Sequence, residues 1–339
     1  MRLDSANRSF LAFMALALSL SAYVLCGALG GVLLPLLLAR ASRDGFHGLL
    51  GERTALLLLL AFLALVAVGL ALAGRSLARQ ILASHRLAGR VRVLARALPD
   101  QLTRAAIQAG LGGRVVLVDA GESFSFVYGV LTPRVAVSRG LLEGISDREL
   151  RAVLEHERYH VSNLDPLKVL LMQAFSAAFF FLPALECLRE RHVAARELAA
   201  DRRAVAICGR RPLAGALLKV IRGPDWDELE VAVAIGGPEL LDVRVAQLET
   251  GTEPRLAALG FTGVVLSFLG VALFAGMFLA SVLSFGGSAA VNHATGSALA
   301  SATLSGGFAC AAPFAGTGML AYLLIALRAR RPLESDRCS

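Results

Sequence analysis

The sequence predicts an α-helical integral membrane protein with a smaller α+β domain on one side of the bilayer. Two observations indicate the membrane class: 56% of the 339 residues are hydrophobic, and the mean hydropathy of +0.65 is too high for an ordinary soluble protein. A third indicates the extra domain, because residues 99–254 hold most of the acidic side chains and show both helix and strand patterns. We therefore expect four spanning helices together with one domain outside the bilayer.

The N-terminal part of the chain contains two long apolar runs. Residues 10–39 form a run too long for the apolar core of a cleavable signal peptide, and residues 54–74 form a second run of spanning length. Residues 1–74 are therefore predicted to be a transmembrane hairpin. A basic loop at 75–96 follows, with arginines and no acidic residue before Asp100. The positive-inside rule places this loop, and the basic N-terminus with it, in the cytoplasm.

The C-terminal part repeats this arrangement. Apolar runs at 256–285 and 305–327 predict the third and fourth spans, and arginines within 328–331 hold the C-terminus on the cytoplasmic side. Residues 256–339 are therefore a second transmembrane hairpin with a short basic tail. Residues 75–255, between the two hairpins, form the predicted cytoplasmic domain.

A helix at 98–109 and a small β-sheet open that domain, with strands predicted at 114–119, 122–128 and 134–138. Residues 122–128 alternate polar and apolar side chains, as a half-buried strand does. One edge of such a sheet can bind an extended substrate peptide by strand addition. The alternative is a sheet that only supports the helix behind it, and both interpretations remain open. The candidate edge strand consists of Ser123, Phe124, Ser125, Phe126, Val127 and Tyr128.

The next helix carries an H-E-x-x-H motif. Ser146 and Glu149 form a capping box, which predicts that the helix starts near Ser146. His156 and His160 are four residues apart and so lie on one face of this helix, one turn from each other. Two imidazoles placed in this way can hold one Zn²⁺ ion. Glu157 lies on the flank, where it can take a proton from a zinc-bound water.

A third ligand is expected, because zinc hydrolases usually have three protein ligands and one open position. The candidate is Glu197, and Asp201 lies four residues on, where it can orient one of the histidines without touching the metal. The alternatives are a surface helix with two chance histidines and ordinary surface carboxylates among arginines. Both motifs occur in the expected order, so we favour a zinc peptidase with one Zn²⁺ per chain.

An apolar stretch at 165–185 separates the two motifs, and hydropathy alone would make it another span. A single crossing would place His156 and Glu197 on opposite sides of the bilayer, where they could not share a metal. We therefore predict a hairpin that re-enters the membrane or lies on it, with its turn near 181–183. Re-entrant backbone is tolerated where protein buries it.

Other classes of function find little support. The five cysteines include no C-x-x-C pair, so neither a disulfide framework nor a cysteine zinc site is indicated. The formal charge of +8 comes mainly from arginines beside apolar runs. Lipid headgroups and membrane topology explain such arginines better than direct nucleic-acid binding does.

With these motifs in view, the chain resembles the membrane gluzincins. The closer match is to the BlaR/MecR-type membrane zinc metallopeptidases, and the HtpX and Ste-type (CAAX) proteases are more distant. The resemblance covers about half of the chain, including the basic loop. It rests on four pieces: residues 125–129 ahead of 133–135, the helix at 149–160 followed by Asp165, the apolar stretch 179–183, and residues 197–201.

The resemblance implies a cytoplasmic zincin domain that acts as an endopeptidase. It carries the metal ligands over to His156, His160 and Glu197 and the catalytic carboxylate to Glu157. The chain departs from the family at Arg158 and Tyr159, where an apolar residue and a small one are more common. No extracellular penicillin-binding sensor domain follows the last predicted span, so we do not expect β-lactam sensing by this chain alone.

The sequence therefore predicts a zinc-dependent endopeptidase of the bacterial-type inner membrane, multi-pass, with its active site and both termini in the cytoplasm. Its substrate is expected to be a cytoplasmic or membrane protein, for example a repressor in antirepressor-like regulation, and a homo-oligomer is left open. The alternative is a non-catalytic zinc-binding membrane regulator or scaffold, which the presence of Glu157 argues against. His192, Tyr128 and a nearby arginine are candidates for stabilising the oxyanion.

Overall fold

The structure is a computed structural model that describes residues 4–28, 53–220, 238–252, 254, 262–263, 265–273 and 276. The chain divides into two compact units, and the unit that contains the predicted site is described here. It comprises Met1–Phe10, Gly74–Ala174 and Arg189–Leu256. The predicted domain boundaries at 74 and 255 stay predictions.

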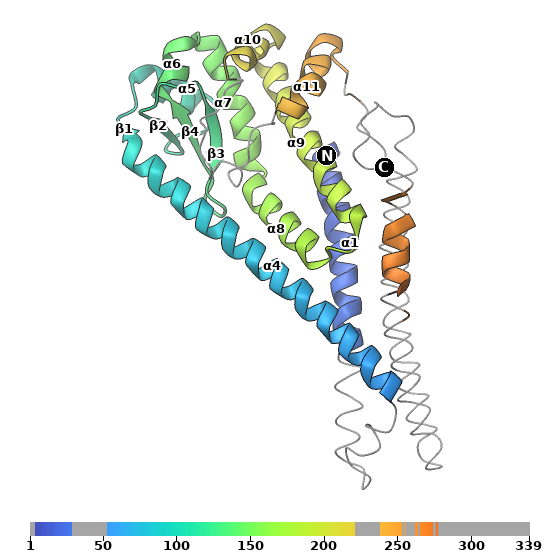
Figure 1. The fold of residues 1–339 in the computed structure, drawn as a ribbon. Coiled ribbons are helices and arrows are strands. Elements are labelled where there is room, and N and C mark those ends of the chain that lie inside the picture. Colours follow the sequence, from blue (N-terminus) through green and yellow to red (C-terminus); the bar gives the residue numbers. More distant parts are fainter. Residues whose placement is uncertain are drawn as a thin grey trace. The chain divides into compact units, whose positions relative to one another are not determined.

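This unit contains a four-stranded mixed sheet (Figure 1). The strands are β1 (Ala95–Arg96), β2 (Val115–Val118), β3 (Ser125–Tyr128) and β4 (Arg134–Ser138). Their order is β1-β2-β4-β3, with β2 and β4 parallel and the other pairs antiparallel. The three longer strands fall within the predicted ranges, although β3 begins only at Ser125. Strand β3 forms one edge of the sheet, because it pairs with β4 alone among the described strands.

Strand β3 is buried on both faces, so the prediction of a half-buried strand was wrong. Val127 faces α7 (Asp147–Ser162) and packs in one core cluster with Leu150 and Leu154. Phe126 and Tyr128 point the other way and pack with a second cluster that includes Leu87 of α4 (Arg53–Leu94). The alternation of side chains is present, but α7 and α4 each cover one face of the strand.

Seven helices complete the described part of this unit beside α1 and α4. They are α5 (Asp100–Gln108), α6 (Arg139–Gly144), α7 (Asp147–Ser162), α8 (Asp165–Ala178), α9 (Pro183–Cys208), α10 (Arg210–Val220) and α11 (Pro238–Thr250). The predicted capping box opens α7: Ser146 Oγ accepts from the Glu149 backbone N–H, and Glu149 Oε2 accepts from the Ser146 N–H at 2.7 Å. The register of the H-E-x-x-H motif on α7 is thereby fixed.

The segment predicted as a hairpin, 165–185, contains α8 and the first residues of α9. The break between them falls at residues 179–182, close to the predicted turn. Glu197 on α9 lies in the same compact unit as His156 and His160, as the hairpin requires.

The connection between α7 and α8 is a single tight turn at Leu164. This residue has a φ of 52°, in the left-handed region that a leucine rarely adopts. The turn starts α8 at once, so Asp165 follows His160 by only five residues and returns to its imidazole. Leu164→Val is expected to unfold at a lower temperature than Leu164→Asn, with about 1 kcal/mol between them, because a β-branched side chain fits this backbone worst. Equal thermal stability of the two variants would show that the turn is unstrained.

Two helices in the described part of the chain are long and apolar enough to cross a membrane: α1 (Ser5–Ala28) and α4 (Arg53–Leu94). They overlap the first two predicted spans, 10–39 and 54–74. The basic segment at 75–96 was predicted as a loop and is instead a continuation of α4 as far as Leu94. Residues 29–52 and nearly all of the third and fourth predicted spans lie outside the described residues.

Candidate metal centre

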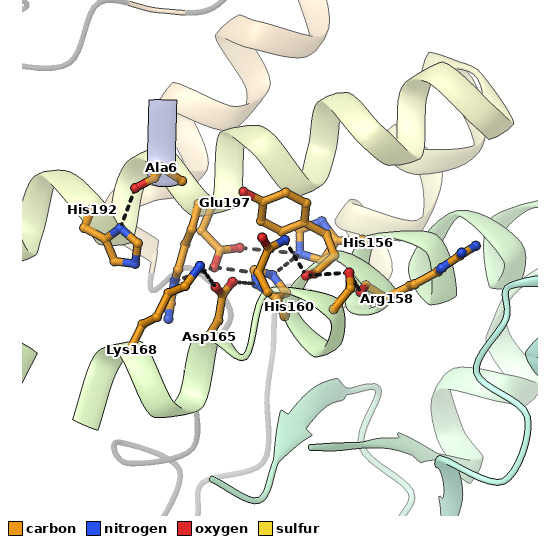
Figure 2. A network of polar contacts seen from close by, with 12 residues as sticks. Ala6, His156, Arg158, His160, Asp165, Lys168, His192 and Glu197 are labelled. Carbon is orange, nitrogen blue, oxygen red and sulfur yellow. Dashed lines mark hydrogen bonds and ion pairs between the residues drawn. The ribbon is translucent and has the colours of Figure 1, made fainter. Parts of the chain in front are cut away.

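The three predicted ligands lie together inside the unit. His156 and His160 come from α7 and Glu197 from α9, all three are buried, and their ligand atoms lie within 4.8 Å of one another. The two Nε2 atoms are 3.2 Å apart, and the Glu197 carboxylate oxygens lie 3.4 and 3.7 Å from them. Figure 2 shows the three side chains pointing toward one another. Among the described residues they form the only such group of metal-ligating side chains.

This group fits a zinc ion by geometry and by chemistry. Ligand bonds of about 2.0–2.2 Å in a tetrahedron separate the ligand atoms by about 3.3–3.6 Å, close to the spacings found here. Both oxygens of Glu197 are buried, yet neither accepts a hydrogen bond from the described protein. A buried carboxylate without hydrogen bonds is costly unless a cation satisfies it. The residues present therefore fit the metal that the motif implies.

Two buried carboxylates orient the histidines from behind. His156 Nδ1 lies 2.9 Å from Asp201 Oδ1, and His160 Nδ1 lies 2.7 Å from Asp165 Oδ2. A carboxylate that accepts the Nδ1 hydrogen leaves the Nε2 lone pair free for a metal and fixes the plane of the ring. The sequence predicted this role for Asp201. It did not predict it for Asp165, although the position of Asp165 five residues after His160 was available as a signal.

Arg244 on α11 supports this arrangement and was missed altogether. Its guanidinium donates two hydrogen bonds of 2.7 Å to the Asp201 carboxylate, and both side chains are buried. The same guanidinium lies 3.8 Å from Glu197 Oε2. Arg196 adds a second cation beside Glu197, at 3.3 Å. The positive charges compensate a cluster of carboxylates that would otherwise repel one another.

Glu157 lies close to the three predicted ligands but is not part of their group. It is 1% exposed, and burial raises its pKa above the usual range. His156 and His160 act in the opposite direction on this pKa, and the nearby Ser125 side chain of β3 also lowers it. A carboxyl group with a raised pKa is suited to take up a proton and release it again near neutral pH.

The other ionisable groups have pKa values set by burial and by their partners. Burial alone would raise the pKa of Glu197, but His160, His156 and the two arginines hold it far below its usual value. Burial alone would lower the pKa of His156, but the neighbouring carboxylates of Asp201 and Glu197 raise it to about 9. In protein without its metal, His156 is therefore protonated at pH 7.

Zinc affinity should consequently depend on pH. A proton on His156 competes with the metal below about pH 9, so the apparent affinity should rise about tenfold between pH 7 and pH 8. Competition titrations with a chelator of known protonation behaviour measure this slope. An affinity that does not change between pH 7 and pH 9 would contradict the assignment of His156 as a ligand.

His192 and Tyr128, two of the candidates for stabilising the oxyanion, make other contacts. Burial lowers the pKa of His192 to about 4, and its Nδ1 lies 3.1 Å from the carbonyl oxygen of Ala6. Figure 2 shows His192 beside Ala6, apart from His156 and His160. Tyr128 packs on the α4 face of the sheet, opposite to the face from which Ser125 approaches Glu157. Neither contact supports a role at the oxyanion.

Only four of the six residues of the predicted edge strand lie in β3. Ser125, Phe126, Val127 and Tyr128 form β3, whereas Ser123 and Phe124 precede it. A small hollow borders the end of β3, lined by Tyr128 and Gly129 together with residues of α4 and α8. Its lining does not include the metal-ligating residues.

Known proteins are similar to part of this chain. Protease HtpX homologues from Bordetella pertussis and Polaromonas naphthalenivorans are 37% identical over 84 and 82 residues, and one from Verminephrobacter eiseniae is 34% identical over 82 residues. Each match covers 24% of this chain and 28–29% of the relative, so the chain spans less than a third of the relatives' length. The family model for the BlaR1 peptidase M56 matches residues 50–248, more than half of the chain. The chain therefore belongs to the M56 family of membrane peptidases.

Proposed function

We propose that the protein is a membrane-integrated, zinc-dependent endopeptidase. The observation that carries this proposal is the meeting of His156, His160 and Glu197 in one buried group, with Glu157 beside it. Membership of a membrane peptidase family supports a proteolytic role. The two long apolar helices support a location in the bacterial inner membrane.

The mechanism follows from the positions of the side chains. A bound Zn²⁺ would supply Lewis-acid chemistry, polarising the scissile carbonyl and making water acidic enough to ionise near pH 7. Glu157 accepts the proton of the attacking water and passes it to the leaving amine. Asp201 and Asp165 keep the two imidazoles neutral at Nε2 and correctly turned.

The outer edge of β3, which no other described strand pairs with, is the proposed binding site for the substrate backbone. An extended peptide added to this edge would run antiparallel or parallel to β3 and hydrogen bond to the strand's backbone. The influence of Ser125, at the start of β3, on the pKa of Glu157 supports this assignment.

The site is proposed to face the cytoplasm, as the arginines after the second span favour. A cytoplasmic or membrane protein is the proposed substrate, and antirepressor-like cleavage of a cytoplasmic repressor is one instance of it. The proposed architecture keeps four spans, the membrane-associated 165–185 hairpin, and the boundaries 1–74, 75–255 and 256–339.

A non-catalytic zinc-binding scaffold is the second candidate. A scaffold is compatible with the ligand group, but it gives the buried carboxyl group of Glu157 no function. A structural zinc site is usually closed by four protein ligands, whereas three are found here among the described residues.

Metal removal tests the proposal. The full chain, purified in detergent, should contain one zinc per chain and cleave casein or itself. A chelator should abolish cleavage, and one equivalent of zinc should restore it. Cleavage that survives removal of zinc would refute the metallopeptidase assignment, whereas bound zinc without any cleavage would favour the scaffold.

A further inference from the structure

The first turns of α1 are packed into the metal-site unit. Ala6 and Ser9 are buried, and Ala6 packs in a cluster with Tyr159 of α7 and with Ala195 and Ala199 of α9. Residues as far as Phe10 belong to the same compact unit as the metal ligands, although α1 continues to Ala28. The start of the first predicted span is therefore part of the metal-site unit as well.

One contact ties this segment to the H-E-x-x-H helix itself. The Tyr159 hydroxyl donates a hydrogen bond of 2.6 Å to Asp4 Oδ2. Tyr159 directly precedes His160, and its ring lies edge-on to the imidazole at 5.8 Å between centroids. The other oxygen of Asp4 accepts from the Asn7 backbone N–H at 2.8 Å. Asp4 therefore both starts α1 and holds the helix that carries the ligand.

A second set of contacts leads to the carboxylate behind His160. Asn7 Oδ1 accepts a hydrogen bond of 2.6 Å from Lys168 Nζ, and Lys168 Nζ lies 3.6 Å from Asp165 Oδ1. Asp165 in turn binds His160 Nδ1 at 2.7 Å. Figure 2 shows Lys168, Asp165 and His160 in this succession. Asn7 also donates to Asn163 Oδ1 at 3.2 Å, at the end of α7.

Each histidine has a carboxylate behind it, and each carboxylate has a cationic side chain beside it. The two cations differ in how firmly they are held. Asp201, behind His156, is fixed by a rigid bidentate guanidinium. Asp165, behind His160, has instead a lysine ammonium, a point charge on a flexible stem that other contacts must hold in place. Those contacts come from α1: the amide of Asn7, and the ring of Phe10, whose centroid lies 5.4 Å from Lys168 Nζ.

We propose that Asp4 and Asn7 are positioning residues of the zinc site, through which the N-terminal turn of α1 fixes the orientation of His160. This proposal rests on the metal site described under the proposed function. It also gives a reason for Tyr159, which departs from the family pattern between the histidines and is the residue that Asp4 binds.

The test compares four variants of the full chain in detergent. Asn7→Leu removes the oxygen that holds Lys168, whereas Asn7→Asp keeps an oxygen there. Tyr159→Phe removes only the hydroxyl that reaches Asp4. Arg8→Gln is the matched control, because Arg8 is exposed on the same turn.

Two measurements report on the metal site separately from activity: competitive zinc affinity, and the visible absorption of the Co²⁺-substituted protein. Asn7→Leu and Tyr159→Phe should each weaken zinc binding about tenfold and shift the Co²⁺ bands, at the lower end of the effect of losing an outer partner. Asn7→Asp and Arg8→Gln should stay close to wild type in both measurements.

The proposal would be overturned if Asn7→Leu and Tyr159→Phe had the same zinc affinity and the same Co²⁺ spectrum as Arg8→Gln. If Asn7→Leu fails to fold, Tyr159→Phe decides, because it keeps the packed ring. A wild-type chain that binds no zinc would instead refute the proposed function, so the two failures are distinguishable.

Discussion

Glu157→Gln should abolish cleavage and leave zinc bound. The substitution keeps the size of the side chain but removes the group that takes the proton from water. Loss of a general base lowers the rate by about 10²–10⁴-fold, and Glu157 also has to deliver the proton to the leaving amine. Because Glu157 is not a ligand, the zinc content should remain at one per chain. Cleavage of casein and metal analysis on the same sample measure both effects.

Glu155→Gln is the matched control for this experiment. Glu155 is also buried on α7, two residues away, but its carboxylate faces Arg158 and Arg203 rather than the histidines. Its substitution should leave cleavage close to the wild-type rate. A Glu157→Gln protein that cleaves as fast as Glu155→Gln would refute the catalytic assignment.

Arg244→Met should destabilise the protein and weaken zinc binding together. The substitution leaves the Asp201 carboxylate buried without its two hydrogen bonds, and breaking a buried pair in this way costs about 3–5 kcal/mol. Asp201 would then hold His156 less firmly, which should lower zinc affinity by about 10–100-fold. Thermal unfolding in detergent and zinc competition measure the two losses.

A double variant separates the charge effect from loss of packing. Asp201→Asn together with Arg244→Met removes both charges, so it should be less destabilising than the sum of the single variants. Strict additivity would mean that the pair contributes nothing as a pair. Arg211→Gln, at an exposed position on the neighbouring helix α10, should change neither property.

The parts of the site that could be predicted from the sequence are those with a local pattern or a strong constraint. The capping box at Ser146 fixed the start of α7 because both of its partners lie within one turn. Glu197 could be paired with His156 and His160 because a shared metal forces the intervening stretch to return. The turn between α8 and α9 was located for the same reason.

Other parts depend on contacts between residues far apart in the chain. Arg244 is 43 residues from Asp201, and nothing in the pattern of α11 distinguishes it from a surface arginine. Asp4 and Asn7 look like an ordinary polar start to a membrane helix. Their role appears only when α1 is packed against α7 and α8.

The basic segment after the second span shows a different limit. Its arginines indicate the side of the membrane but not the conformation of the backbone. The segment contains no proline and many strong helix formers, so α4 continues through it. Leu87 and Val91 of this continuation cover β3, which is why the strand is buried on both faces.

X-ray absorption at the zinc edge of the purified chain tests the central claim most directly. The account predicts one zinc with two imidazole nitrogens and a carboxylate oxygen at about 2.0–2.2 Å, and loss of this signature in a Glu197→Ala variant. A sulfur ligand at about 2.3 Å, or an unchanged spectrum after Glu197→Ala, would contradict it.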